Sequence, residues 1–145
     1  MNGTEDAASR AAELWQALPL GYALTVLLEM PILLVGLSPR HSWGRKIFAG
    51  FWLTACTYPI VVLVLPLLLE QRFGTAVYLA VAETFAPLAE CTLFWLASYS
   101  LPAHTQPPLT RRDFWRDMTA IVVANLTSFL IGGLLWQIIF PSAQT

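Results

Sequence analysis

Four long apolar segments constrain the fold of this chain more than any other feature. A helix needs about 20 mostly apolar residues to cross the hydrocarbon core of a membrane. Four segments reach that length, and they cover residues 18–37, 47–69, 75–100 and 118–140. The links between them are too short to form a soluble domain, so the sequence predicts a single transmembrane domain over residues 1–145.

The composition agrees with this prediction. Of the 145 residues, 57% are hydrophobic and 12% are charged, whereas a soluble domain typically carries about 25% charged residues. Residues 5–16 follow a pattern typical of a short amphipathic helix lying at the membrane interface. The predicted fold class is therefore all-α: a polytopic membrane protein with a four-helix transmembrane bundle and a short amphipathic N-terminal helix.

The distribution of positive charge predicts an orientation. The links 38–46 and 101–117 carry three Lys or Arg residues each, whereas the opposite side has only Arg10 and Arg72. Cytoplasmic links are enriched in Lys and Arg, so we expect these two links to be cytoplasmic and both termini to lie outside. The net charge of −1 argues against a nucleic-acid partner, which leaves the lipid bilayer as the expected environment.

Every predicted span carries a polar side chain near its middle. Glu29, Tyr58, Glu90 and Asn125 lie within about 6 Å of their span midpoints at 1.5 Å per residue, and Glu83 lies about 6 to 7 Å toward the outer side. An acidic residue near the bilayer centre costs about 2.5–3.5 kcal/mol to insert, and such residues usually mark a functional site. We therefore predict that these five residues form an ion or substrate pathway, with Glu29 and Glu90 as the candidate metal ligands.

Three prolines accompany these polar residues. Pro31, Pro59 and Pro87 each lie within about one turn of a predicted pathway residue. A proline inside a helix removes a backbone donor, and the freed carbonyl must find another partner in a membrane. Broken helices of this kind recur at transporter ion sites, so the three prolines are predicted to break the helices there. The alternative is that they only kink the helices for packing.

Small residues recur at every fourth position of the last span. They are Ala120, Ala124, Ser128 and Gly132. Such a stripe lets another helix approach closely. The sequence predicts a packing seam here but does not say whether the seam faces the same chain or a neighbouring one.

Three classes of function remain after these observations. The favoured one is a small transporter or channel for a proton, a metal cation or a cation-coupled solute, completed by a homo-oligomer or a partner membrane subunit. The alternative is a non-catalytic accessory or assembly subunit of a larger membrane complex, in which the glutamates would pair with basic residues of a partner. An enzyme is least favoured, because His41 and His104 fall in the links and no zinc-protease or serine-hydrolase motif occurs. The residues indicate no cofactor.

Overall fold

The computed structural model describes residues 3–100 and 110–139, and all regular structure in these ranges is helical. In chain order the elements are α1 (Gly3–Gly36), α2 (Trp43–Pro59), the π-helical turns η1 (Ile60–Val64) and η2 (Pro66–Glu70), α3 (Gln71–Phe73), α4 (Thr75–Trp95), the π-helical turn η3 (Leu96–Ser100) and α5 (Arg111–Ile139). Four stretches, residues 11–36, 43–73, 75–99 and 111–135, are long and apolar enough to cross a membrane. The predicted all-α class with four apolar helices is thereby confirmed.

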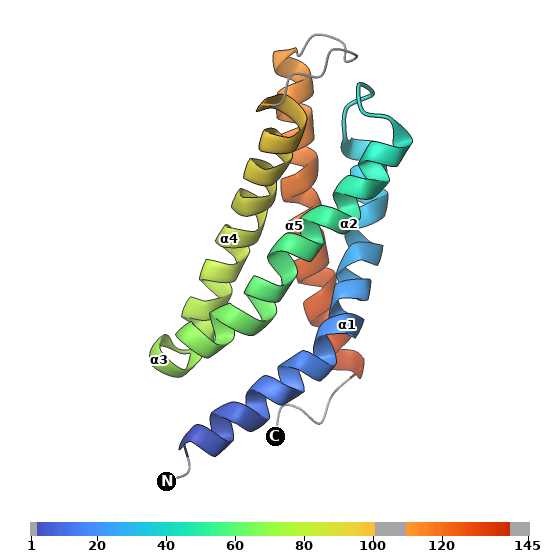
Figure 1. Ribbon diagram of the computed structural model, residues 1–145. Coiled ribbons are helices and arrows are strands. Elements are labelled where there is room, and N and C mark those ends of the chain that lie inside the picture. Colours follow the sequence, from blue (N-terminus) through green and yellow to red (C-terminus); the bar gives the residue numbers. More distant parts are fainter. Residues whose placement is uncertain (1–2, 101–109, 140–145) are drawn as a thin grey trace.

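Some predicted boundaries are wrong. Residues 5–16 do not form a separate helix, because α1 runs without interruption from Gly3 to Gly36. Figure 1 shows the blue N-terminal part of α1 inclined to the rest of the helix, and Pro19 lies inside α1. A proline inside a helix both removes a hydrogen bond and pushes the helix axis aside, which accounts for a change of direction without a break.

The last helix begins earlier than predicted. α5 starts at Arg111 instead of residue 118, so much of the charged run that reads as a link is helical. Thr110 caps this helix: its Oγ1 accepts the backbone N–H of Asp113 at 3.1 Å and donates to the Asp113 carboxylate at 2.6 Å. The first bond is that of an N-cap side chain, and in the second the Thr110 hydroxyl takes the place of the backbone N–H that donates in a capping box. The rest of the predicted link, including His104, lies outside the described residues, as do residues 140–145.

The four long helices form a bundle in which each helix has two main neighbours. α1 packs against α2 and α5, and α4 packs against the same two helices. α1 and α4 therefore lie on one diagonal of the bundle, and α2 and α5 lie on the other. Figure 1 shows the α1–α2 link at the same end of the bundle as the start of α5, and we call this the loop end.

The second and third apolar segments, which end and begin on either side of Gly74, are joined at the other end of the bundle by a tight reversal. Pro59 and Pro66 lack a backbone N–H, and the α-helical pattern changes to the π-helical turns η1 and η2 where they occur. Gly74 separates α3 from α4 with a φ of 83°, a conformation that other residues rarely adopt. The chain thus turns from one helix into the next at a single residue.

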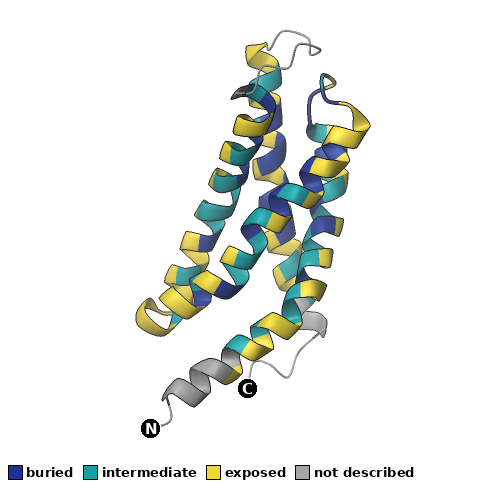
Figure 2. Ribbon diagram, in the orientation of Figure 1, coloured by how far each residue is buried: buried dark blue, intermediate teal, exposed yellow. Residues whose placement is uncertain are grey.

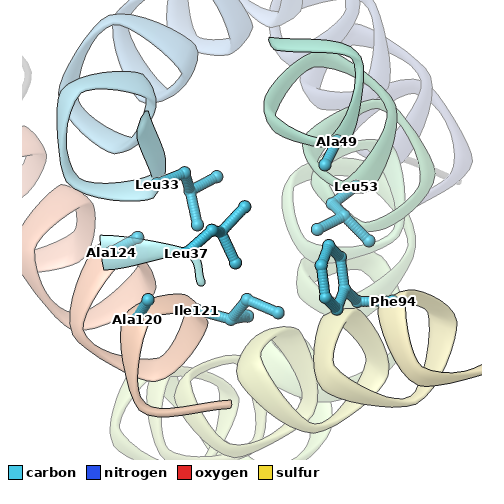
Figure 3. Close-up of a cluster of buried hydrophobic side chains, with 8 residues drawn as sticks. All are labelled: Leu33, Leu37, Ala49, Leu53, Phe94, Ala120, Ile121 and Ala124. Carbon is cyan, nitrogen blue, oxygen red and sulfur yellow. The ribbon is translucent and has the colours of Figure 1, made fainter. Parts of the chain in front are cut away.

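The apolar core lies between all four long helices. Figure 3 shows its side chains pointing toward a common centre: Leu33, Leu37, Ala49, Leu53, Phe94, Ala120, Ile121 and Ala124. The outer surface is also rich in apolar side chains, and Leu27, Val35 and Leu130 are 62–76% exposed. Figure 2 shows exposed residues along every long helix.

The predicted packing seam on α5 faces α1 of the same chain for most of its length. Ala120, Ala124 and Ser128 are all buried. A Cβ atom added at Gly36 of α1 would lie only 2.7 Å from the Cβ of Ala120. Gly132 differs, because nothing lies within 4 Å of a Cβ added there. The seam therefore ends before Gly132.

Candidate functional site

The carboxyl group of Glu29 lies inside the bundle, where α1 faces both α2 and α5. Its side chain is 2% exposed. Thr54 of α2 donates to Oε2 at 2.8 Å, and Ser128 of α5 donates to Oε1 at 2.7 Å. Each carboxyl oxygen therefore has one hydrogen-bond partner, and both partners are neutral hydroxyl groups.

Glu90 has a matching environment on the opposite side of the bundle. It comes from α4 and is also 2% exposed. Thr57 of α2 donates to Oε1 at 2.7 Å, and the amide of Asn125 on α5 donates to Oε2 at 2.8 Å. α2 and α5 thus supply the donors for both glutamates, while α1 and α4 supply the carboxyl groups.

The spacing of the donors defines a compact polar layer. Thr54 and Thr57 are three residues apart on α2, and Asn125 and Ser128 are three residues apart on α5. Three residues correspond to about 4.5 Å along a helix. α2 and α5 both run away from the loop end, and Glu29 bonds the nearer donor on α2 but the farther one on α5, whereas Glu90 does the reverse. The two offsets therefore oppose each other, and the two carboxyl groups lie at a similar depth in the bundle. We call the six residues Glu29, Thr54, Thr57, Glu90, Asn125 and Ser128 the glutamate layer.

Each hydroxyl group of the glutamate layer has a second acceptor within reach. Thr54 Oγ1 lies 2.8 Å from the carbonyl of Gly50, Thr57 Oγ1 lies 3.1 Å from that of Leu53, and Ser128 Oγ lies 2.9 Å from that of Asn125. A hydroxyl group has one hydrogen and can also accept. When the hydrogen turns to the backbone carbonyl, the hydroxyl oxygen is free to accept a hydrogen bond from the O–H of a neutral carboxyl group.

Asn125 lacks this freedom. The two hydrogens of its amide nitrogen serve Glu90 Oε2 at 2.8 Å and the Ile121 carbonyl at 3.1 Å. Oε2 of Glu90 is therefore always an acceptor, and a proton on this carboxyl group lies on Oε1, facing Thr57. The layer can hold either glutamate ionised or neutral with only hydroxyl hydrogens moving.

Neither glutamate has a cationic neighbour that neutralises it. No Lys, Arg or His side chain hydrogen-bonds or ion-pairs with Glu29 or Glu90 in the part of the chain that the structure describes. Burial without such a partner disfavours the ionised form of a carboxyl group. Within the same residues no three His, Cys, Asp or Glu side chains come together as metal ligands. Metal binding by Glu29 and Glu90 therefore stays a prediction, and these two side chains are its only proposed ligands.

Two of the predicted pathway residues lie apart from the glutamate layer. Tyr58 packs over α1, where a Cβ atom added to Gly21 would lie 1.8 Å from its hydroxyl oxygen, and its ring contacts Tyr22 edge to face. Glu83 is half-buried and has one buried carboxyl oxygen without a hydrogen-bond partner among the described residues. The structure joins Glu29, Glu90 and Asn125, and it adds Thr54, Thr57 and Ser128 to them.

The three predicted helix breaks differ from one another. α1 continues through Pro31 and α4 continues through Pro87. α2 ends at Pro59, where the π-helical turn η1 follows. Only Pro59 of the three therefore accompanies a change in helix type, and Pro31 is exposed on the outside of the bundle.

A second buried acid lies at the loop end, and the sequence did not indicate it. Asp117 of α5 is fully buried. The backbone N–H of Ser38 donates to Oδ1 at 2.5 Å, while Oδ2 accepts from Ser38 Oγ at 3.2 Å, from the Tyr99 hydroxyl and from His41 Nε2 at 2.8 Å. The hydrogen is assigned to Nε2 because Oδ2 is already an acceptor for Tyr99. We call these four residues the aspartate cluster.

Two cations beside the aspartate cluster cap the end of α1. Lys46 Nζ donates to the carbonyls of Leu34 and Leu37 at 3.1 and 2.7 Å, and Arg116 donates to those of Val35 and Gly36 at 3.0 and 2.7 Å. The last carbonyls of a helix have no partner within the helix, and cations are favoured there. Lys46 and Arg116 therefore have a structural role besides any influence on orientation.

Comparison of the chain with protein-family models, with curated proteins and with solved structures finds no significant match.

Proposed function

We propose that this protein is a small integral membrane transporter in which the glutamate layer takes up and releases protons. The observation that carries the proposal is the pair of buried carboxyl groups of Glu29 and Glu90, whose oxygens all accept hydrogen bonds and which have no cationic partner among the described residues. An ionisable residue inside a membrane domain is a functional-site hypothesis by default. The hydroxyl groups around it supply the means for a carboxyl group to change charge without rearrangement of the backbone.

Among the cations that the sequence left open, the proton fits this layer best. All four carboxyl oxygens already accept a hydrogen bond from a hydroxyl or amide donor. A metal ion needs bare oxygen ligands, typically six or more for Ca²⁺, and those donors would have to turn away first. A proton needs one carboxyl oxygen and one acceptor, and Thr54, Thr57 and Ser128 can each become that acceptor.

The proposal includes the membrane setting. The four apolar helices would span the bilayer as a bundle, with the N-terminal part of α1 lying at the interface. The loop end would face the cytoplasm and both termini the outside, because Arg40, Arg45, Lys46, Arg111, Arg112 and Arg116 belong to the loop-end side. Single-cysteine variants at residues 44 and 112, tested with a membrane-impermeant thiol reagent, should react only after the membrane is opened. Labelling in intact cells contradicts this orientation.

Proton flux into proteoliposomes tests the function. Vesicles that contain an internal pH dye and an imposed potential should acidify when they carry the wild-type protein. Glu29→Gln and Glu90→Gln should abolish this flux, because glutamine keeps the hydrogen bonds but cannot release a proton. Glu83→Gln should have a milder effect, because Glu83 lies outside the glutamate layer.

A matched pair of threonine variants controls for general damage. Thr57→Val removes a hydroxyl group that faces Glu90, whereas Thr84→Val removes an exposed hydroxyl group that bonds to its own helix at 2.8 Å. The proposal expects slower flux for the first variant and wild-type flux for the second. Equal flux in all variants, at equal protein content, contradicts a role for the glutamate layer.

An accessory subunit is the second candidate, and one observation favours it. The outward face of α4 carries a shallow apolar groove of about 570 Å³ lined by Ala76, Ala80, Thr84 and Leu88, among others. A partner helix could use such a face of small residues. A subunit of this kind would carry no flux when reconstituted alone, whereas a transporter or its homo-oligomer would.

A further inference from the structure

A cavity of about 260 Å³ opens at the loop end between the α1–α2 link, α2 and the end of α4 with η3. Its lining includes His41, Gly44, Arg45, Trp52, Phe94 and Ser98. Neither Glu29 nor Glu90 lines it. The cavity is therefore distinct from the glutamate layer, and its use does not depend on the proposed proton transport.

His41 brings an oriented imidazole ring to this cavity. The side chain is only 4% exposed, and its Nε2 is held by the buried carboxylate of Asp117 at 2.8 Å. The edge of the ring packs against Phe94, with centroids 5.2 Å apart. A carboxylate on one ring nitrogen fixes the orientation and the tautomer of the ring. Nδ1 is thus the ring nitrogen left for a ligand.

Arg45 supplies a positive charge at the same cavity. Its side chain is exposed, and no hydrogen bond or ion pair joins its guanidinium group to another residue in the ranges 3–100 and 110–139. Lys46 and Arg116 add further positive charge nearby, whereas Asp117 is the acid that contacts His41. A guanidinium group pairs well with a carboxylate or a phosphate.

The remaining walls are apolar and aromatic. Trp52 stacks with Phe48, with centroids 6.2 Å apart and an interplanar angle of 9°, and Phe94 is 4% exposed. A volume of about 260 Å³ equals roughly nine water molecules at their share of liquid volume. An apolar pocket with a few placed polar groups is the usual form of a small-molecule site.

We propose that this cavity binds a small amphipathic anion: an acid group held by Arg45 and His41 Nδ1, attached to an apolar body that packs between Trp52 and Phe94. One proton, brought by the acid or taken from solvent, lies between Nδ1 and a ligand oxygen and completes an N–H···O hydrogen bond. The acid group can be a free carboxylate or the phosphate of an anionic lipid, since Arg45 pairs with both.

Nitrogen NMR of the histidine rings tests this site in the full chain. The chain has 2 histidines, so His41→Asn assigns the His41 signals of protein labelled with ¹⁵N-histidine in phosphatidylcholine nanodiscs. Benzoate is the probe for a free acid, and replacing part of the phosphatidylcholine by phosphatidylglycerol is the probe for a lipid. The proposal expects at least one probe to shift Nδ1 of His41 saturably toward the protonated form.

Two variants separate binding in the cavity from a general effect of charge. Gly44→Phe should abolish the shift, because Gly44 lines the cavity and nothing lies within 4 Å of a Cβ added there, so the phenyl ring has room to occupy the space of the ligand. Gly132→Phe, at another open position, should leave the shift unchanged. Arg45→Gln should weaken binding about tenfold, the size of one charge-assisted hydrogen bond.

The outcomes are all decisive. A shift with benzoate but not with phosphatidylglycerol assigns a free acid, and the reverse assigns a lipid headgroup. The proposal is overturned if neither probe shifts Nδ1, or if Gly44→Phe responds like the wild-type protein. Failure here leaves Glu29 and Glu90 untouched, so it is distinguishable from failure of the proposed proton transport.

Discussion

The glutamate layer and the aspartate cluster are both buried acids in one bundle, but their donors differ in kind. Glu29 and Glu90 accept from three hydroxyl groups that each have another acceptor nearby, and from the amide of Asn125. Asp117 Oδ1 accepts from a backbone N–H, which cannot turn, and Oδ2 accepts from an imidazole Nε2 besides the hydroxyl groups of Ser38 and Tyr99. Every carboxyl oxygen in the two sites has a donor, but only in the glutamate layer does each carboxyl group have an oxygen whose one donor is a hydroxyl group that can reverse.

Because of this difference, the glutamates can take up a proton without losing hydrogen bonds, whereas protonation of Asp117 would set its proton against existing donors. A proton on Asp117 Oδ1 would oppose the Ser38 N–H, and one on Oδ2 would oppose up to three donors. Asp117 is therefore suited to a permanent negative charge beside Lys46 and Arg116. A proton on Glu29 or on Glu90 Oε1 instead faces a hydroxyl oxygen that can accept a hydrogen bond from it.

Replacing a buried carboxyl group by an amide should destabilise the protein more at Asp117 than in the glutamate layer. Asp117→Asn must keep an oxygen opposite the Ser38 N–H, so its NH₂ group opposes the donors on His41 and Tyr99. We expect the free energy of unfolding to fall by about 1.5–3 kcal/mol, the range for hydrogen bonds to charged groups. Denaturant titration in detergent micelles measures it. A loss no greater than that of Glu90→Gln would remove the distinction between the two sites.

Replacing the Glu90 carboxyl group by an apolar side chain should lower the free energy of unfolding somewhat less than Asp117→Asn does. Glu90→Leu leaves the donors of Thr57 and Asn125 facing an apolar side chain, and we expect a loss of about 1–3 kcal/mol. Adding Asn125→Leu should restore part of it, because both partners are then apolar. A double-mutant cycle on the same titration checks this, and strict additivity would contradict the hydrogen bond between Glu90 and Asn125.

The close approach of α1 and α5, which connects the two regions, should be sensitive to a single methyl group. Gly36→Ala places its Cβ 2.7 Å from that of Ala120, and overpacking of this kind costs about 1–3 kcal/mol. Gly132→Ala is the matched control, since that position is open and alanine favours a helix by about 1 kcal/mol over glycine. A Gly36→Ala variant as stable as Gly132→Ala would contradict the seam.

The smallest expected effect on stability is that of glutamine in the glutamate layer. In Glu90→Gln the amide oxygen keeps the bond from Asn125, and the NH₂ group donates to Thr57, whose hydrogen turns to the Leu53 carbonyl 3.1 Å away. We expect a change below about 1 kcal/mol, as for hydrogen bonds that are exchanged and not lost. A loss as large as that of Glu90→Leu would mean that the carboxylate charge itself stabilises the fold.

The sequence predicted the glutamate layer in part because helical spacing carries the information. Glu29, Glu90 and Asn125 all come from the middle of apolar spans, so depth alone brings them together. Depth did not separate them from Tyr58 and Glu83, because it does not specify which neighbour a side chain meets. The prediction did not include Thr57, the donor to Glu90 on α2, although its position three residues after Thr54 places both hydroxyl groups on one side of the helix.

The aspartate cluster escaped prediction because of one boundary. The run from Thr110 to Asp117 contains five charged residues and reads as a link, although Thr110 and Asp113 form the pattern of a capping box. Starting the helix there would have placed Asp117 about two turns inside α5. Its pairing with His41 would still have been hidden, since the two are 76 residues apart.

Infrared difference spectroscopy of the carboxyl groups tests the central claim most directly. Neutral carboxyl groups have a C=O band that carboxylates lack, and a pH titration in nanodiscs follows its loss. The account predicts a titrating band from buried carboxyl groups that falls in Glu29→Gln and again in Glu90→Gln, remains in Glu83→Gln, and is accompanied by proton release in solution. A spectrum in which Glu29→Gln and Glu90→Gln leave every titrating band unchanged would contradict reversible protonation of the glutamate layer.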